Sequence, residues 1–138
     1  LVRTFASVAK NLSMDHVLIV HGFDGLDEIT ITDSTYVAEL KDNTISEYEI
    51  SPKDFGLSLG TLPEISASSP DDSLQLIREA FSGDQSAVQD MIALNAGAAL
   101  YLAKKVDSIE NGVELSFELM NNGMAADKLA SYVRVSNS

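Results

Sequence analysis

Cysteine is absent from the 138 residues, so the chain has no disulfides, zinc–thiolate sites or thiol nucleophile. Basic residues are scarce, with 9 Lys and Arg against 21 Asp and Glu, which gives a net charge of −12. General binding to nucleic acid or to an anionic membrane requires a basic surface, so this charge argues against both. A local phosphate site remains compatible with it, because a bound divalent cation can supply the positive charge.

Long hydrophobic runs are also absent. No apolar stretch approaches the roughly 20 residues that a membrane helix needs, and Leu1–Leu12 has the pattern of an amphipathic helix, with no signal-peptide centre. Hydrophobic residues nevertheless make up 45% of the chain, enough to bury the core of one ordinary domain. We expect a cytoplasmic protein without membrane contact. The chain starts inside a predicted helix and without Met, so we also expect further residues upstream.

The hydrophobic spacing of the first fifty residues predicts an α/β architecture. Apolar residues recur at helical spacing over residues 2–12, and a continuous apolar run over 16–20 predicts a strand buried on both faces. A helix followed by such a strand is typical of an α/β domain with a parallel sheet. Residues 29–32, 36–40 and 45–50 predict a small meander at the edge of a mixed sheet.

The rest of the sequence predicts mainly helices. Ser51 and Pro52 form a helix-start signal, residues 56–72 predict a loop, and helical spacing begins at Ser73. Four helices are expected from there on, the third beginning after Asn111-Gly112. We find no repeat and no internal boundary, so residues 1–138 are expected to belong to one domain.

The stretch from Val20 to Glu28, VHGFDGLDE, carries the clearest chemical signal. Gly22 and Gly25 allow a positive φ or a close approach to a ligand, and Asp24, Asp27 and Glu28 offer hard oxygen donors. Mg²⁺ is typically held by one or two carboxylates together with substrate phosphates, and ligands of α/β sheets sit at the carboxyl ends of strands. The residues alone leave a second interpretation open, a solvated acidic turn in which Asp24 forms an Asx turn.

His21 also has two interpretations. A single His at the end of a strand can act as an acid or base, but it is more often a hydrogen-bonded structural residue. We favour the structural role, and we assign no catalytic residue in this sequence.

Several motifs together make the chain similar to the anthranilate phosphoribosyltransferases. The run HGFDGLDE at residues 21–28 resembles the signature of that family. Residues 51–57 (SPKDFGL), 94–100 (LNAGAAL), 112–115 (GVEL) and 122–125 (NGMA) resemble later family segments in the same order and spacing. Each motif is weak alone, but the agreement covers essentially the whole chain.

The resemblance implies a fold, a reaction and a metal site. It implies the C-terminal part of the nucleoside phosphorylase/phosphoribosyltransferase catalytic domain, in a cytoplasmic, homodimeric enzyme of tryptophan biosynthesis. That enzyme transfers the phosphoribosyl group of phosphoribosyl pyrophosphate to anthranilate. In the family the Asp-Glu pair binds Mg²⁺, a role that the resemblance places on Asp27 and Glu28 and not on Asp24. Asn95 and Gly97 match a segment that we interpret as helix packing, with Asn95 hydrogen-bonded locally.

Other family motifs do not occur in the sequence. The glycine-rich GTGGD loop that cradles pyrophosphate and the KHGN segment are missing, so we expect a fragment that is inactive alone. Three alternatives stay open: a nucleic-acid-binding paralogue without catalysis, a related nucleoside phosphorylase, and a structural domain with an acidic turn. The net charge of −12 speaks against the first.

Overall fold

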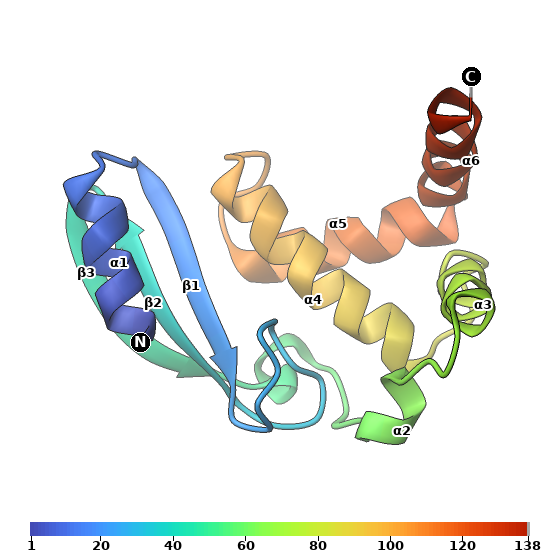
Figure 1. Ribbon diagram of the computed structural model, residues 1–138, viewed down its shortest axis with the longest axis horizontal. Helices are drawn as coiled ribbons and strands as arrows, with labels where there is room; N and C mark the ends of the chain where they lie inside the picture. The colour runs from blue at the N-terminus through green and yellow to red at the C-terminus, as the bar shows by residue number, and fades with distance from the viewer. Residues whose placement is uncertain (138) are drawn as a thin grey trace.

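The computed structural model describes residues 1–137, in which three antiparallel strands are followed by a group of helices. The strands are β1 (His16–Gly22), β2 (Thr35–Lys41) and β3 (Thr44–Ile50), hydrogen-bonded in the order β1-β2-β3. Figure 1 shows the sheet with one helix at its side, and the remaining helices grouped beyond β1. The long loop between β1 and β2 lies at the junction of the two groups, next to the start of the helical half.

Six α-helices and one short 3-10 helix lie within residues 1–137. They are α1 (Val2–Asn11), η1 (Pro52–Phe55), α2 (Leu62–Ile65), α3 (Pro70–Ala80), α4 (Ala87–Leu102), α5 (Ile109–Asn121) and α6 (Met124–Ser136). In Figure 1, α4 crosses the middle of the molecule, with α5 behind it and α3 and α6 at the far end from the sheet. None of these described helices is long and apolar enough to cross a membrane.

The apolar run of β1 follows from contacts on both faces of the sheet. Side chains alternate along a strand, so Leu18 and Val20 point to one face and Val17 and Ile19 to the other. Leu18 and Val20 pack against the main core, on the side of α4, while α1 packs against the sheet. The predicted strand is confirmed, although its residues are half-buried instead of fully buried.

The main core lies where α4 and α5 meet the sheet and its long loop. Two side chains of that loop, Ile29 and Ile31, are 3% and 0% exposed and pack with Leu94 and Val113. Fully burying an Ile or Leu side chain contributes about 1.5–3 kcal/mol. These contacts anchor the C-terminal side of the loop to the helical half of the molecule.

The structure corrects the predicted sheet in two respects. All pairs among the described strands are antiparallel, so the expected parallel pairing and mixed sheet are wrong for residues 1–137, while the β2–β3 meander is confirmed. Residues 29–32 form no strand. Two of their backbone N–H groups donate to side chains instead of to a neighbouring strand. The N–H of Ile29 donates to Asn95 and the N–H of Thr30 donates to the Thr35 hydroxyl, both at 3.0 Å.

Two helix starts also differ from the prediction. α3 begins at Pro70, before Ser73, because the Ser69 hydroxyl accepts from the Asp72 N–H and proline suits the first turn. α5 begins at Ile109, so the prediction of a start after Asn111-Gly112 is wrong. The expected loop over residues 56–72 also contains the short α2.

Gly112 lies inside α5 because it faces α4 at very short range. A Cβ atom built on Gly112 would lie 2.3 Å from the carbonyl oxygen of Gly97, and one built on Gly97 would lie 2.6 Å from the backbone nitrogen of Val113. Only glycine permits this approach of the two backbones. The predicted packing role of Gly97 is therefore confirmed, and Gly112 is its counterpart.

Candidate functional site

The loop between β1 and β2 is held in shape by its own backbone. The N–H of Gly22 donates to the Leu26 carbonyl at 2.8 Å, and the N–H of Phe23 donates to the Ser34 carbonyl at 2.9 Å. Gly25 has a φ of +97°, in the region that favours glycine. Gly22 is buried, and a Cβ atom there would lie 2.4 Å from an Asp24 oxygen. The predicted positive φ is confirmed at Gly25, while at Gly22 the close approach is to the Asp24 side chain within the loop.

Asp24 is the internal anchor of this loop. Its Oδ1 accepts from the N–H of Leu26 at 3.0 Å, the predicted Asx turn, and its Oδ2 accepts from the hydroxyls of Thr30 and Thr32. Burial alone would raise the pKa of Asp24, but these hydrogen bonds outweigh it and lower the pKa below 3.8. Both oxygens of the Asp24 carboxylate thus accept hydrogen bonds from the protein itself.

We expect Asp24→Asn to destabilise the chain by about 1–2 kcal/mol, because hydrogen bonds to a charged acceptor become bonds to a neutral one. Urea unfolding at pH 7 measures the change, with Asp27→Asn as the control. Asp27 is exposed and accepts no hydrogen bond from residues 1–137, so its substitution should leave the midpoint unchanged. Equal midpoints for the two variants would contradict the anchoring role of Asp24.

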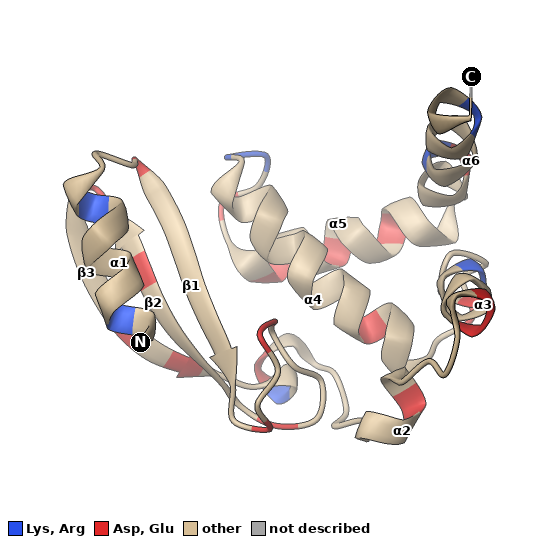
Figure 2. Cartoon of the chain, in the orientation of Figure 1, with Lys and Arg blue, Asp and Glu red and all other residues tan. Residues whose placement is uncertain are grey.

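Asp27 and Glu28, the predicted metal ligands, differ from Asp24 in their exposure and in their hydrogen bonding. They are exposed, and their carboxylates accept no hydrogen bond and form no ion pair within the described chain. They are adjacent in sequence and lie directly before the buried Ile29. Figure 2 shows acidic positions along this loop with few basic ones near it. The loop therefore presents two adjacent carboxylates to solvent from a backbone that is fixed on both sides.

This donor set fits Mg²⁺ bound together with a phosphate ligand. Among residues 1–137 no three His, Asp or Glu side chains come close enough to hold a metal by themselves. Mg²⁺ commonly takes one or two carboxylates from the protein and completes its octahedron with water and substrate phosphates. Two carboxylates without protein partners can supply that share, and the remaining positions would be left to a phosphate ligand and water.

His21 and Asp90 form no hydrogen bond with the acidic pair in the described structure. The ring of His21 is exposed and makes no hydrogen bond in the described structure, so the prediction of a hydrogen-bonded side chain is wrong; His21 pairs with Tyr36 through its backbone. Asp90 is 7% exposed, its Oδ1 has no partner among residues 1–137, and burial raises its pKa. A buried carboxyl group that resists ionisation is a poor ligand for Mg²⁺.

Asn95 of α4 makes contacts that the sequence did not reveal. Its Oδ1 accepts from the N–H of Ile29 at 3.0 Å, and its Nδ2 donates to the carbonyl of the same residue at 2.9 Å. Nδ2 also donates to the Met91 carbonyl at 3.0 Å. The predicted local hydrogen bond is thus confirmed by the contact with Met91, and the two bonds to Ile29, 66 positions away, are additional. The sequence feature that could have indicated these contacts is an amide within an otherwise apolar helical run, since buried polar groups need partners.

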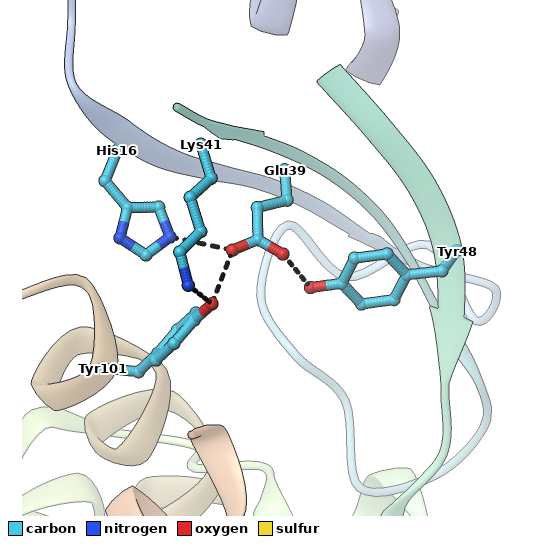
Figure 3. Close-up of polar contacts among 5 residues, drawn as sticks. All are labelled: His16, Glu39, Lys41, Tyr48 and Tyr101. Atoms are coloured by element: carbon cyan, nitrogen blue, oxygen red, sulfur yellow. Dashed lines mark hydrogen bonds and ion pairs between the residues drawn. The ribbon is translucent and has the colours of Figure 1, made fainter. Parts of the chain in front are cut away.

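A second polar cluster lies toward the other end of the strands, around Glu39 of β2 (Figure 3). The Glu39 carboxylate is 8% exposed and accepts hydrogen bonds from His16 Nε2 at 2.8 Å, from Tyr101 at 2.8 Å and from Tyr48 at 2.9 Å. Lys41 donates to the Tyr101 hydroxyl at 2.9 Å. The cluster joins all three strands to α4.

The comparisons with known proteins agree with these features. The family model described as "Glycosyl transferase family, a/b domain" matches residues 1–126. An anthranilate phosphoribosyltransferase from Vesicomyosocius okutanii is 45% identical over 136 residues, which are 99% of this chain and 40% of that protein. The chain thus spans about 40% of the length of the curated relatives that it matches first.

Solved structures of the same enzyme share the fold. The anthranilate phosphoribosyltransferase of Thermus thermophilus is 28% identical, with a TM-score of 0.88 over 99% of this chain and 40% of its own. The Saccharomyces cerevisiae enzyme in complex with PRPP and Mg is 23% identical, with a TM-score of 0.84 over 99% of this chain and 40% of its own. The chain therefore belongs to the glycosyl transferase a/b-domain family, and within that family it is similar to the anthranilate phosphoribosyltransferases.

Proposed function

We propose that the protein containing this chain transfers the phosphoribosyl group of phosphoribosyl pyrophosphate to anthranilate in tryptophan biosynthesis. The observation that carries this proposal is the Asp27-Glu28 pair, two exposed carboxylates without protein partners on a loop pinned by Asp24 and Asn95. The similarity to anthranilate phosphoribosyltransferases over 99% of the chain supplies the substrate class. The complex of the yeast relative with PRPP and Mg supports the metal and the pyrophosphate donor.

Asp27 and Glu28 would act on the leaving group. Expulsion of pyrophosphate from C1 of the ribose concentrates negative charge on the leaving oxygens, which bound Mg²⁺ neutralises electrostatically. The two carboxylates hold the ion in place and transfer no proton. Gly22 and Gly25 set the backbone path that brings the pair to the surface. We assign no acid or base among the described residues.

We further propose that residues 1–138 form the C-terminal part of a larger α/β domain, and that this part alone does not catalyse the transfer. Two carboxylates complete only part of a magnesium coordination shell, and the sequence contains no glycine-rich loop to cradle the pyrophosphate. From the resemblance alone, we propose a homodimeric enzyme that works in the cytoplasm.

Substitution of the two ligands tests the metal assignment. In the polypeptide encoded by the complete reading frame, we expect Asp27→Asn and Glu28→Gln each to raise the half-saturating Mg²⁺ concentration about tenfold or more, equivalent to about 1.4 kcal/mol. Both changes keep the side-chain shape and remove the charge. Initial rates across a magnesium titration at fixed phosphoribosyl pyrophosphate measure the shift.

Asp33→Asn is the matched control for this titration. Asp33 lies on the same loop and is exposed, and its carboxylate accepts from the N–H of Ser34 at 2.7 Å. We expect its magnesium dependence to equal that of the wild type. Wild-type rates of both ligand variants at limiting magnesium would disprove the assignment, and absence of transfer by the wild-type polypeptide would disprove the proposed reaction.

A further inference from the structure

The position of Glu28 depends on a residue that lies 66 positions away from the loop in sequence. Ile29 follows Glu28 directly, and both polar groups of its backbone are bound by the single side chain of Asn95. The Asn95 amide thus binds the backbone of Ile29 as a neighbouring strand would, with one accepted and one donated hydrogen bond. A pair of bonds in opposite directions fixes both the distance and the rotation of that peptide segment.

Asn95 is itself held in one orientation. Its second Nδ2 hydrogen donates to the Met91 carbonyl one turn earlier in α4, so both donors of the amide are used. Its neighbours Leu94 and Ala98 are 0% and 6% exposed, so this part of α4 is anchored in the core. The Ile29 side chain packs into the same core, at 3% exposure. The two hydrogen bonds between Asn95 and Ile29, called the clamp below, therefore connect α4 to the residue next to the acidic pair.

Glu28 and Asn95 also line the same surface cavity, together with Met91 and Ile92 of α4 and Ile65 of α2. Glu28 is thus exposed beside the helix that carries the clamp, and not at the tip of an unsupported loop. Groups that orient metal ligands from outside the coordination shell typically change metal affinity 10–100-fold when removed.

We propose that Asn95 is a positioning residue for the metal-binding pair: through the backbone of Ile29 it sets the direction in which Asp27 and Glu28 present their carboxylates to a phosphate-bound divalent cation. This inference rests on the proposed function for the identity of the ligand. Asn95 does not contact the cation in this arrangement, because both of its Nδ2 donors and its Oδ1 acceptor face backbone groups.

Asn95→Leu removes the clamp at similar volume and without adding charge, and Asn95→Ala is the second variant in case leucine does not fit. Gln89→Met is the matched control. Gln89 is a buried amide on the same helix, but its Nε2 donates to the Ala80 carbonyl at 2.9 Å and to Asn121 at 3.1 Å, away from the loop. The Asn95 and Gln89 variants all lose buried hydrogen bonds, but only Asn95 contacts the segment that carries the acidic pair.

Two measurements on the polypeptide encoded by the complete reading frame test the proposal. Amide hydrogen exchange should show loss of protection at Ile29 in both Asn95 variants and not in Gln89→Met. Binding of Mn²⁺ in the presence of inorganic pyrophosphate, followed by electron paramagnetic resonance, should weaken about tenfold in the Asn95 variants. The affinity of Gln89→Met should stay at the wild-type value.

The outcomes separate this inference from the proposed reaction. Equal Mn²⁺ affinity of wild type and Asn95 variants, an equal loss in Gln89→Met, or no Mn²⁺ binding by the wild type would each overturn the positioning role. If the wild type binds Mn²⁺ with pyrophosphate but transfers nothing to anthranilate, the proposed reaction fails and the positioning role of Asn95 stands.

Discussion

Gly112→Ala is expected to destabilise the fold, although alanine is the better helix former. Helix propensity alone would favour alanine by about 1 kcal/mol at a position inside α5. The added methyl group would lie 2.3 Å from the carbonyl oxygen of Gly97 and 2.8 Å from its Cα atom. These are backbone atoms of α4, which cannot move aside like the end of a flexible side chain. Overpacking costs typically about 1–3 kcal/mol, and contact with backbone atoms places this site at the upper end, so after the gain in helix propensity we expect a net loss of about 2 kcal/mol.

Gly112→Val extends the same test. The two further methyl groups at this site should prevent the native packing of α5 on α4, since typical domains have only about 5–15 kcal/mol of stability in total. Urea denaturation followed by circular dichroism measures both variants.

Asn111→Ala is the control for the helix effect. Asn111 is the preceding residue of the same helix, and it is exposed, so alanine there should stabilise slightly or leave the midpoint unchanged. If Gly112→Ala stabilised the chain as Asn111→Ala does, α4 and α5 would not approach as closely as the structure has them.

The elements that the sequence predicted well are those specified by nearby residues. The α1 helix, the strand at β1 and the start of η1 at Ser51-Pro52 depend on spacing, side-chain branching and a cap within a few positions. For Asp27 and Glu28 the local residues left both a metal-binding loop and a solvated acidic turn open, and the family resemblance assigned the pair to Mg²⁺. The ligand assignment itself remains a prediction.

The elements that were missed depend on contacts between distant segments. Residues 29–32 alternate like a strand, but Asn95 and Thr35 bind the backbone positions where a partner strand would pair. The Asn111-Gly112 pair has the composition of a turn, but Gly112 is inside a helix because Gly97 lies against it. In both cases a contact with a distant residue of α4, Asn95 or Gly97, outweighs a local preference of about 1 kcal/mol. A single sequence contains the partner but does not indicate that the two meet.

Glu39→Leu is expected to have the largest effect of any single change outside the α4–α5 contact. The Glu39 carboxylate is the common acceptor for His16, Tyr48 and Tyr101 (Figure 3), and leucine accepts from none of them. A buried donor left without a partner costs about 1–3 kcal/mol, so three of them, partly rehydrated, should cost about 3 kcal/mol or more. Glu49→Leu is the control, since Glu49 is exposed on β3 and its side chain forms no hydrogen bond within residues 1–137.

The pH dependence of stability distinguishes the charge of Glu39 from its shape. Burial alone would raise the pKa of Glu39, but the hydrogen bonds from His16, Tyr101 and Tyr48 outweigh it and hold the pKa below its ordinary 4.5. A carboxylate with a lowered pKa in the folded state contributes stability that is fully present above the unfolded pKa and is lost as pH falls through the folded pKa.

Glu39→Gln keeps the shape and one acceptor oxygen but cannot titrate. The difference in unfolding free energy between wild type and Glu39→Gln should therefore shrink as pH falls below about 5. A difference that stays constant down to about pH 3 would show that the ionised form of Glu39 stabilises the fold no more than the protonated form does.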